Sequence, residues 1–198
     1  MKWHIDITDV VMQTDMRMYI PMEPNKYKEL KNGRSVYCTL KEAPWKVTAE
    51  MIIGYGFLKE KQIQSTKTFP PSENAVPTIG WYRCGGSFSS PERGDDFIYK
   101  NPDDILVEVD IPLKLLLFSD ALAWNAIMNG EYYPYLNDLE ALDKELKEFQ
   151  EMNVFEQEKA IRQSWERAMD VDLYGDFVVG TVWKIEPWML VEKHCKEE

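Results

Sequence analysis

Histidine and cysteine, the residues most used in nucleophilic and zinc chemistry, are scarce in this chain. His4 and His194 stand near opposite ends of the sequence, so a Ser-His-Asp or Cys-His arrangement would need one end folded into the active site. The three cysteines are widely spaced, and the His194 and Cys195 pair has no second pair to complete a zinc site. Neither a GxxxxGKS/T loop nor a GxGxxG motif is present. The sequence therefore predicts no metal site and identifies no catalytic residue.

The first candidates for binding chemistry are Trp81 and Arg83. They belong to a strand-like segment, residues 78–84, in which alternate residues share one face. An arginine beside an aromatic ring can hold a planar anionic ligand by bidentate hydrogen bonds and stacking. The alternative is that Trp81 packs in the core while Arg83 pairs with an acidic surface residue.

Ser119 and Asp120 follow an apolar run and precede the helical segment ALAWNAI. Both residue types are favourable helix N-caps, which explains them without any ligand. The functional alternative is a pocket for anions or sugar hydroxyls, formed where strand ends face a helix N-terminus. Trp124, four residues after Asp120, would lie on the same helix face. We therefore expect a polar notch at residues 118–120, beside Arg83 and Trp124.

Arg167 lies in the segment SWERAMD, residues 164–170, next to Trp165, which helical spacing turns inward. An arginine beside a buried tryptophan usually forms a salt bridge at the protein surface, and a ligand-binding role is the alternative. The candidate ligand-binding residues are Trp81, Arg83, Ser119, Asp120, Trp124 and Arg167.

Strands and helices must position these side chains. Alternation of apolar residues predicts an edge strand at residues 3–7 and further strands along the chain. The further strands span residues 17–22, 35–40, 78–84, 105–110, 115–118 and 176–185. Loops are expected over residues 64–77 and 85–96, where serine, proline and glycine gather.

Helical patterns fill the remaining segments. Pro24 opens a short helix that Gly33 ends, and Pro44 precedes a helix over residues 45–60. The face of this second helix that we expect to be buried consists of Trp45, Ala49, Ile52 and Ile53. Residues 137–170 are predicted to form a pair of polar helices.

Strands scattered among helices of unequal length fit an α+β domain better than a regular βαβ succession. We predict a single domain over residues 1–198, a size that can bury a substantial core. Its central sheet is mixed or antiparallel with flanking helices, and the 137–170 helical pair is inserted before the last strand.

The chain is acidic: 34 Asp and Glu residues against 23 Lys and Arg give a net charge of −11. Direct nucleic-acid binding is not expected, because a phosphate-backbone binder needs a basic surface. A basic protein partner or simple solubility remains open. An acidic decoy for a nucleic-acid-binding surface would need its acids on one face, whereas here they are spread among lysines.

Localisation follows from what the sequence lacks. No apolar run approaches the ~20 residues of a membrane helix, so no membrane partner is expected. No secretory signal pattern or CxxC spacing occurs either. We therefore expect a cytoplasmic protein with reduced thiols.

The order of several segments resembles a known family. The segments are MYIPM, EPNKYKELKNG, WKVTAEMI, IGWYRC, LVEVDIPLKLLLFSDALAWNAIMNGEYYP, SWERAMD and GTVWKI. In this order, over residues 17–193, they resemble the uncharacterised bacterial and phage family called domain of unknown function 3841 (DUF3841). The resemblance implies a bacterial or phage cytosolic protein and no established activity.

The chain departs from that family's pattern at two positions. Asn125 stands where a histidine commonly follows the helix tryptophan, and Lys184 stands where a glutamate commonly follows the tryptophan of the last strand. If either family residue is catalytic, this chain is impaired.

Two functions are compatible with these observations. The first is a non-catalytic binding module, in a phage–host setting, for a small anionic or nucleotide-like ligand or for a protein partner. It requires no cofactor. The alternative is a divergent ADP-ribosyltransferase-like enzyme, in which arginine, tyrosine and a glutamate, here Glu186, would orient the cofactor NAD. No oligomeric state follows from the sequence.

Overall fold

The computed structural model describes residues 14–42, 47–86, 103–134, 139–171, 173 and 176–191. Five antiparallel strands form the main sheet in the order β5-β1-β4-β7-β6. They are β1 (Asp15–Met22), β4 (Thr78–Arg83), β5 (Ile105–Pro112), β6 (Leu117–Asp120) and β7 (Val178–Val182). A small second sheet pairs β2 (Cys38–Thr39) with β3 (Ala75–Val76). The strand expected at residues 3–7 lies outside the described residues.

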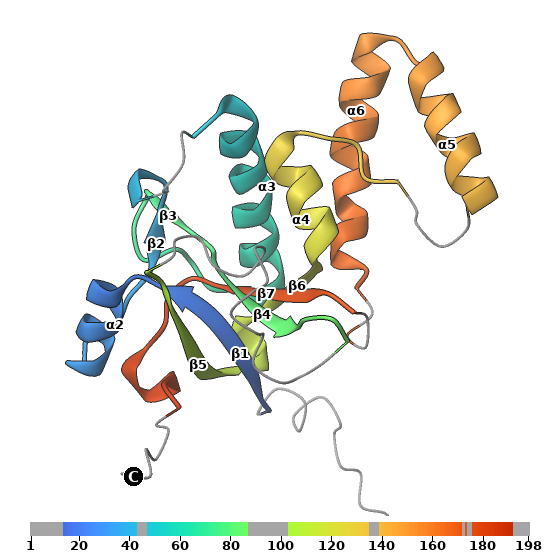
Figure 1. Ribbon diagram of the computed structural model, residues 1–198. Helices are drawn as coiled ribbons and strands as arrows, with labels where there is room; N and C mark the ends of the chain where they lie inside the picture. The colour runs from blue at the N-terminus through green and yellow to red at the C-terminus, as the bar shows by residue number, and fades with distance from the viewer. Residues whose placement is uncertain are drawn as a thin grey trace, which may run out of the picture.

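The longer helices are α2 (Pro24–Lys31), α3 (Ala49–Thr66), α4 (Ala121–Asn129), α5 (Leu139–Glu151) and α6 (Val154–Ser164). Among the described residues there are also four short 3₁₀-helices: η1 (Leu40–Glu42), η2 (Leu113–Leu115), η3 (Trp165–Met169) and η4 (Pro187–Met189). Figure 1 shows α3, α4 and α6 side by side over the sheet, with α5 outermost. The predicted α+β class is confirmed, including the helical pair before the last strand. Of the helices described, none is both long and apolar enough to cross a membrane.

One face of the sheet packs on side chains from α2, η4 and the segments beside them. Leu30 of α2 and Met189 of η4 join the apolar residues of β1 and β5 in a single buried cluster. Two glycines face each other across β4 and β7, and they give the β1 side chains room. A Cβ on Gly80 would lie 2.6 Å from Ile20 Cγ1, and one on Gly180 would lie 2.7 Å from Met18 Cε.

The opposite face packs on α3, α4 and η3, with Leu58, Ile127 and Trp165 in the buried cluster. The fully buried amide of Gln62 on α3 joins this layer to the sheet. Its Nε2 donates to the carbonyl oxygen of Leu115 at 3.0 Å, and its Oε1 accepts from the hydroxyl of Thr181 at 2.6 Å. Both polar ends of the amide are therefore satisfied inside the protein, as burial of a polar group requires.

The prediction for α3 was wrong in its bounds and its buried face. The helix begins at Ala49 after the N-cap Thr48, whose hydroxyl accepts from Met51 N at 3.3 Å, and it runs to Thr66. The predicted buried residues Ala49, Ile52 and Ile53 are exposed, and Trp45 lies outside the described residues. The residues buried instead are Gly54, Tyr55, Leu58 and Gln62. Apolar residues occur on both sides of α3, so periodicity alone chose the wrong side.

Other boundaries also differ from the predictions. Within residues 35–40 only Cys38–Thr39 is a strand, and Val36 forms an isolated bridge to Ile185. Part of the loop expected over residues 64–77 belongs to α3 and β3. Gly33 does follow the end of α2 with a positive φ of 82°, the left-handed conformation typical of a helix C-terminus.

Two glycines on α3 offer a matched test of how α3 packs on α4. A Cβ on Gly54 would lie 2.6 Å from the carbonyl oxygen of Ile127, whereas one on Gly56 would have no neighbour within 4 Å. We expect Gly54→Ala to lower the free energy of unfolding by about 1–3 kcal/mol, because α4 must move away. Gly56→Ala should raise it by about 0.5–1 kcal/mol through helix propensity. Urea denaturation of both variants measures the difference, and equal effects would contradict this packing.

Candidate functional site

Four of the six predicted binding residues lie at one end of the sheet. On the adjacent strands β4, β7 and β6, Trp81 and Ser119 both pair with Val179. One step further along, Arg83 and Asp120 both pair with Val178. The topology thus brings the two predicted segments to the same sheet end, with β7 between them.

A β-bulge separates the faces of Trp81 and Arg83. The register shifts between these residues, so that Trp81 faces Val179 while Arg83 faces Val178. Consecutive residues of β7 point to opposite faces of the sheet, and their partners do the same. The expectation that Trp81 and Arg83 share a face was therefore wrong, because alternation counts residues and a bulge adds one.

The Arg83 side chain closes the turn that follows β4. It is only 9% exposed, and its guanidinium donates to the carbonyl oxygen of Gly86. Gly85 and Gly86 both have positive φ, 58° and 75°, and Gly86 N donates to the carbonyl oxygen of Asp176 at 2.9 Å. Arg83 thus helps to fix the turn beside the start of β7.

Asp120 caps α4, as the sequence predicted. Its Oδ1 accepts from the backbone N–H of Leu122 at 2.7 Å and of Ala123 at 3.1 Å. Its carboxylate also lies near the hydroxyl of Tyr133. The pKa of the Tyr133 hydroxyl lies well above its usual range. Burial is the largest cause, and the negative charge of Asp120 is the second. Asp120 therefore serves the junction between β6, α4 and the segment after α4.

Ser119 belongs to β6 and does not cap the helix. Its side chain is buried, and its hydroxyl finds no hydrogen-bond partner among the described residues. Adjacent strands are about 4.8 Å apart, so residues on β4 and β6 are roughly 10 Å apart with β7 between them. Side-chain hydrogen bonds join Arg83 to the turn after β4 and Asp120 to the start of α4.

Trp124 and Arg167 also have structural contacts. Trp124 packs edge-to-face on Tyr55, with 6.2 Å between ring centroids. Arg167 Nη1 donates to Glu145 Oε1 at 2.5 Å and to the carbonyl oxygen of Tyr133 at 3.0 Å, and its guanidinium lies 5.6 Å from the centre of the Tyr132 ring. The predicted salt bridge of Arg167 is confirmed. It joins η3 to α5.

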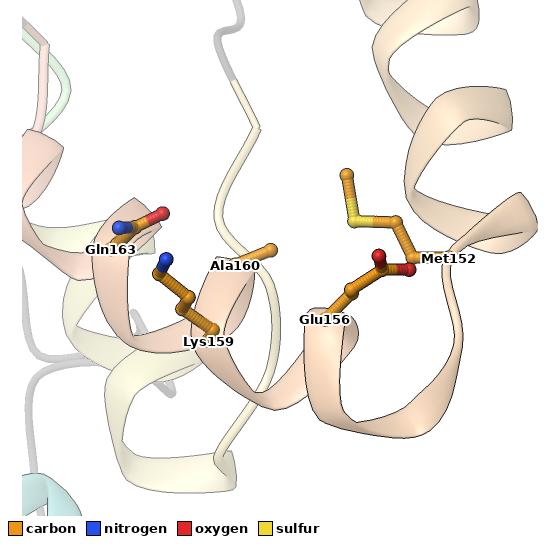
Figure 2. A pocket seen from close by; sticks show the side chains of 5 residues that line it. All are labelled: Met152, Glu156, Lys159, Ala160 and Gln163. Carbon is orange, nitrogen blue, oxygen red and sulfur yellow. The ribbon is translucent and has the colours of Figure 1, made fainter.

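The free end of the helical pair has the opposite character, because apolar side chains there face solvent. We call Met152, Val154 and Phe155 the hairpin tip; they are 36%, 68% and 84% exposed. A hollow of about 300 Å³ adjoins the tip. Its lining consists of Met152, Glu156, Lys159, Ala160 and Gln163, and Figure 2 shows Glu156 beside Met152 and the other three along α6. Sequence reasoning missed this site.

A capping box holds the hairpin tip in place. Asn153 Oδ1 accepts from the backbone N–H groups of Phe155 and Glu156, both at 3.1 Å. Glu156 Oε2 accepts in return from Asn153 N at 3.0 Å, and Gln157 Nε2 donates to the carbonyl oxygen of Phe149 at 3.2 Å. The spacing of Asn153 and Glu156 is the sequence signal that could have located this helix start.

In the part of the chain that the structure describes, no group of three His, Cys, Asp or Glu residues could hold an ion.

Comparison with known proteins identifies a family. The model of the family described as "Domain of unknown function (DUF3841)" matches residues 19–190, which confirms the resemblance stated from the sequence. No curated protein and no solved structure matches the chain.

The neighbouring residues Asp120 and Ser119 can be tested as a pair. Asp120→Ala should lower the free energy of unfolding by about 0.5–2 kcal/mol, because α4 loses its N-cap. Ser119→Ala should leave it unchanged or raise it, because the buried hydroxyl that is removed has no partner within the described residues. Urea denaturation followed by circular dichroism measures both, and a larger loss at Ser119 would show that its hydroxyl is needed.

Arg167→Met tests the attachment of α5. The change leaves the half-buried carboxylate of Glu145 without its cation, so local opening of α5 should become easier by about 1–3 kcal/mol. Hydrogen exchange should accelerate in α5 and stay constant in β7. The control is Lys144→Ala, which removes an exposed pair with Glu148 on the same helix and should change little. Equal acceleration in both variants would refute the special role of Arg167.

Proposed function

This chain belongs to the DUF3841 family, and from that premise we propose that it is a non-catalytic binding module whose ligand is a protein partner. The partner docks on the hairpin tip. The observation that carries the proposal is the Phe155 ring, 84% exposed at the ordered start of a helix. The proposed setting is the bacterial cytoplasm during conflict between phage and host.

An exposed apolar tip suits protein recognition for two reasons. Burying a large apolar side chain is worth roughly 1.5–3 kcal/mol, so Val154 and Phe155 offer a partner substantial binding energy. The capping box at Asn153 fixes the backbone that carries both side chains. Less conformational freedom is then lost on association, which favours affinity.

A protein partner is favoured over a small anionic or nucleotide-like ligand by the contacts at the sheet end. Arg83 bonds the turn at Gly86, Asp120 caps α4, and Arg167 pairs with Glu145. These three polar side chains contribute to the fold, so each has a reason to be present without a ligand.

The alternative, an ADP-ribosyltransferase-like enzyme, gains no support from the arrangement. Glu186 follows the Val182 end of β7, whereas Arg83 lies beside the Val178 end. The carboxylate of Glu186 pairs with Lys184 at 2.5 Å and accepts from the hydroxyl of Ser35. Both bonds lower the pKa of the Glu186 carboxyl, and the bond from Lys184 is the larger cause. The glutamate is therefore engaged away from the candidate arginine.

The test compares two exposed phenylalanines in capture experiments from the source cells. Phe155→Ser should weaken capture of the partner roughly tenfold or more, because it removes the proposed anchor. Phe69→Ser is the matched control: Phe69 is 74% exposed and lies in the segment between α3 and β3, so its loss should leave capture unchanged. A photo-crosslinking residue at position 155, but not at 69, should label the same partner.

Two outcomes would contradict the proposal. Capture that is unaffected by Phe155→Ser, or weakened equally by Phe69→Ser, would remove the hairpin tip from recognition. Consumption of labelled NAD by the purified protein would instead favour the enzymatic alternative.

A further inference from the structure

The hairpin tip is bordered by acidic side chains. Glu151 at the end of α5 and Glu156 and Glu158 in the first turns of α6 are all exposed, and Lys159 is the cation among residues 151–159. Three carboxylates and one ammonium group therefore surround the apolar tip, giving it a local excess of negative charge.

The stability of the helices accounts for only part of this charge. Glu156 serves the capping box, and a carboxylate in the first turn of a helix is favoured by the helix dipole. Glu151 lies at the C-terminal end of α5, where a negative charge is unfavourable and where the last turn contains no basic residue. Glu158 makes no ion pair within the described residues. Helix stability therefore gives no reason for Glu151, while Glu158 has only the favourable spacing to Arg162, four residues further along α6.

Resting on the protein-binding function proposed above, we infer that the partner presents a basic amphipathic surface to the hairpin tip. Apolar side chains of that surface cover Val154 and Phe155, and lysine or arginine side chains at its margin face Glu151 and Glu158. Such an arrangement buries the ring while leaving the charged pairs at the rim, where they steer association and select the partner.

The same charges argue against other occupants. A second copy of this chain would bring an identical acidic tip and a net charge of −11. An anionic membrane or a nucleic acid would also be repelled by the exposed carboxylates. A cationic, partly apolar protein surface is the occupant that matches both the exposed apolar side chains and the charge.

The probes for this inference are three labelled synthetic peptides, followed by fluorescence anisotropy. One is an amphipathic helix of leucine and lysine, one replaces its lysines by glutamate, and one replaces its leucines by serine. The first should bind the full chain at least tenfold more tightly than either of the others, and its affinity should fall as salt is added.

Variants of the chain separate the two components of the surface. Phe155→Ser should weaken binding of the leucine–lysine helix at unchanged net charge. The double change Glu151→Gln with Glu158→Gln should weaken it severalfold and flatten its salt dependence. Glu23→Gln with Glu29→Gln removes the same charge around α2, where both side chains are exposed, and should leave binding as in the parent. Glu156 is kept because it belongs to the capping box.

The result that overturns the inference differs from the one that overturns the proposed function. Equal binding of the lysine and glutamate helices, or indifference to Glu151→Gln with Glu158→Gln, would refute a basic partner surface even if Phe155→Ser abolishes capture from cells. Loss of binding in the α2 control would show that overall charge, rather than the charge beside the hairpin tip, governs binding. That result would refute the inference as well.

Discussion

The amide of Gln62 is the polar contact on which the helical layer depends. It is buried between α3 and the sheet, and its two ends bond the carbonyl of Leu115 and the hydroxyl of Thr181. Because a buried amide is costly unless both ends are bonded, this contact favours one position of α3 along the sheet. Gly54 then admits the backbone of α4, and Lys61 pairs with Glu166 of η3 at 2.6 Å. The position of α3 thus determines where the helical hairpin begins.

In this protein two arginine side chains are buried or half-buried and an apolar ring is exposed, the reverse of the usual arrangement. Arg83 is buried and Arg167 is half-buried, and each donates to a main-chain carbonyl. These bonds stabilise a turn and a helix junction. The Phe155 ring at the hairpin tip is 84% exposed and has no comparable role among the contacts of the described residues. The residues that resemble a binding site in the sequence thus stabilise the fold. The surface proposed for recognition consists of residues that resemble ordinary core positions in the sequence.

Local patterns were predictable from the sequence, and contacts between distant segments were not. The strand alternation and the cap at Asp120 are set by neighbouring residues, so both could be predicted. The bulge after Trp81 depends on pairing with a strand almost a hundred residues away. From the sequence alone, the exposed face of α3 resembles a buried one, because Ile52 and Ile53 have the spacing of an apolar helix face. Packing on α4 through Gly54 decides which side of α3 is buried. The exposure of Phe155 could not be predicted for the same reason.

The segment that follows α4 contacts the end of α6, so the chain before and after the α5–α6 hairpin lies together. Tyr133 N donates to Ser164 Oγ and the Trp165 indole N–H donates to the carbonyl oxygen of Glu131, both at 2.9 Å. A segment that leaves and re-enters a fold at one place can change length or sequence with little effect on its surroundings, as domain insertions do. The sheet of this chain can therefore tolerate changes in the length or sequence of the α5–α6 hairpin.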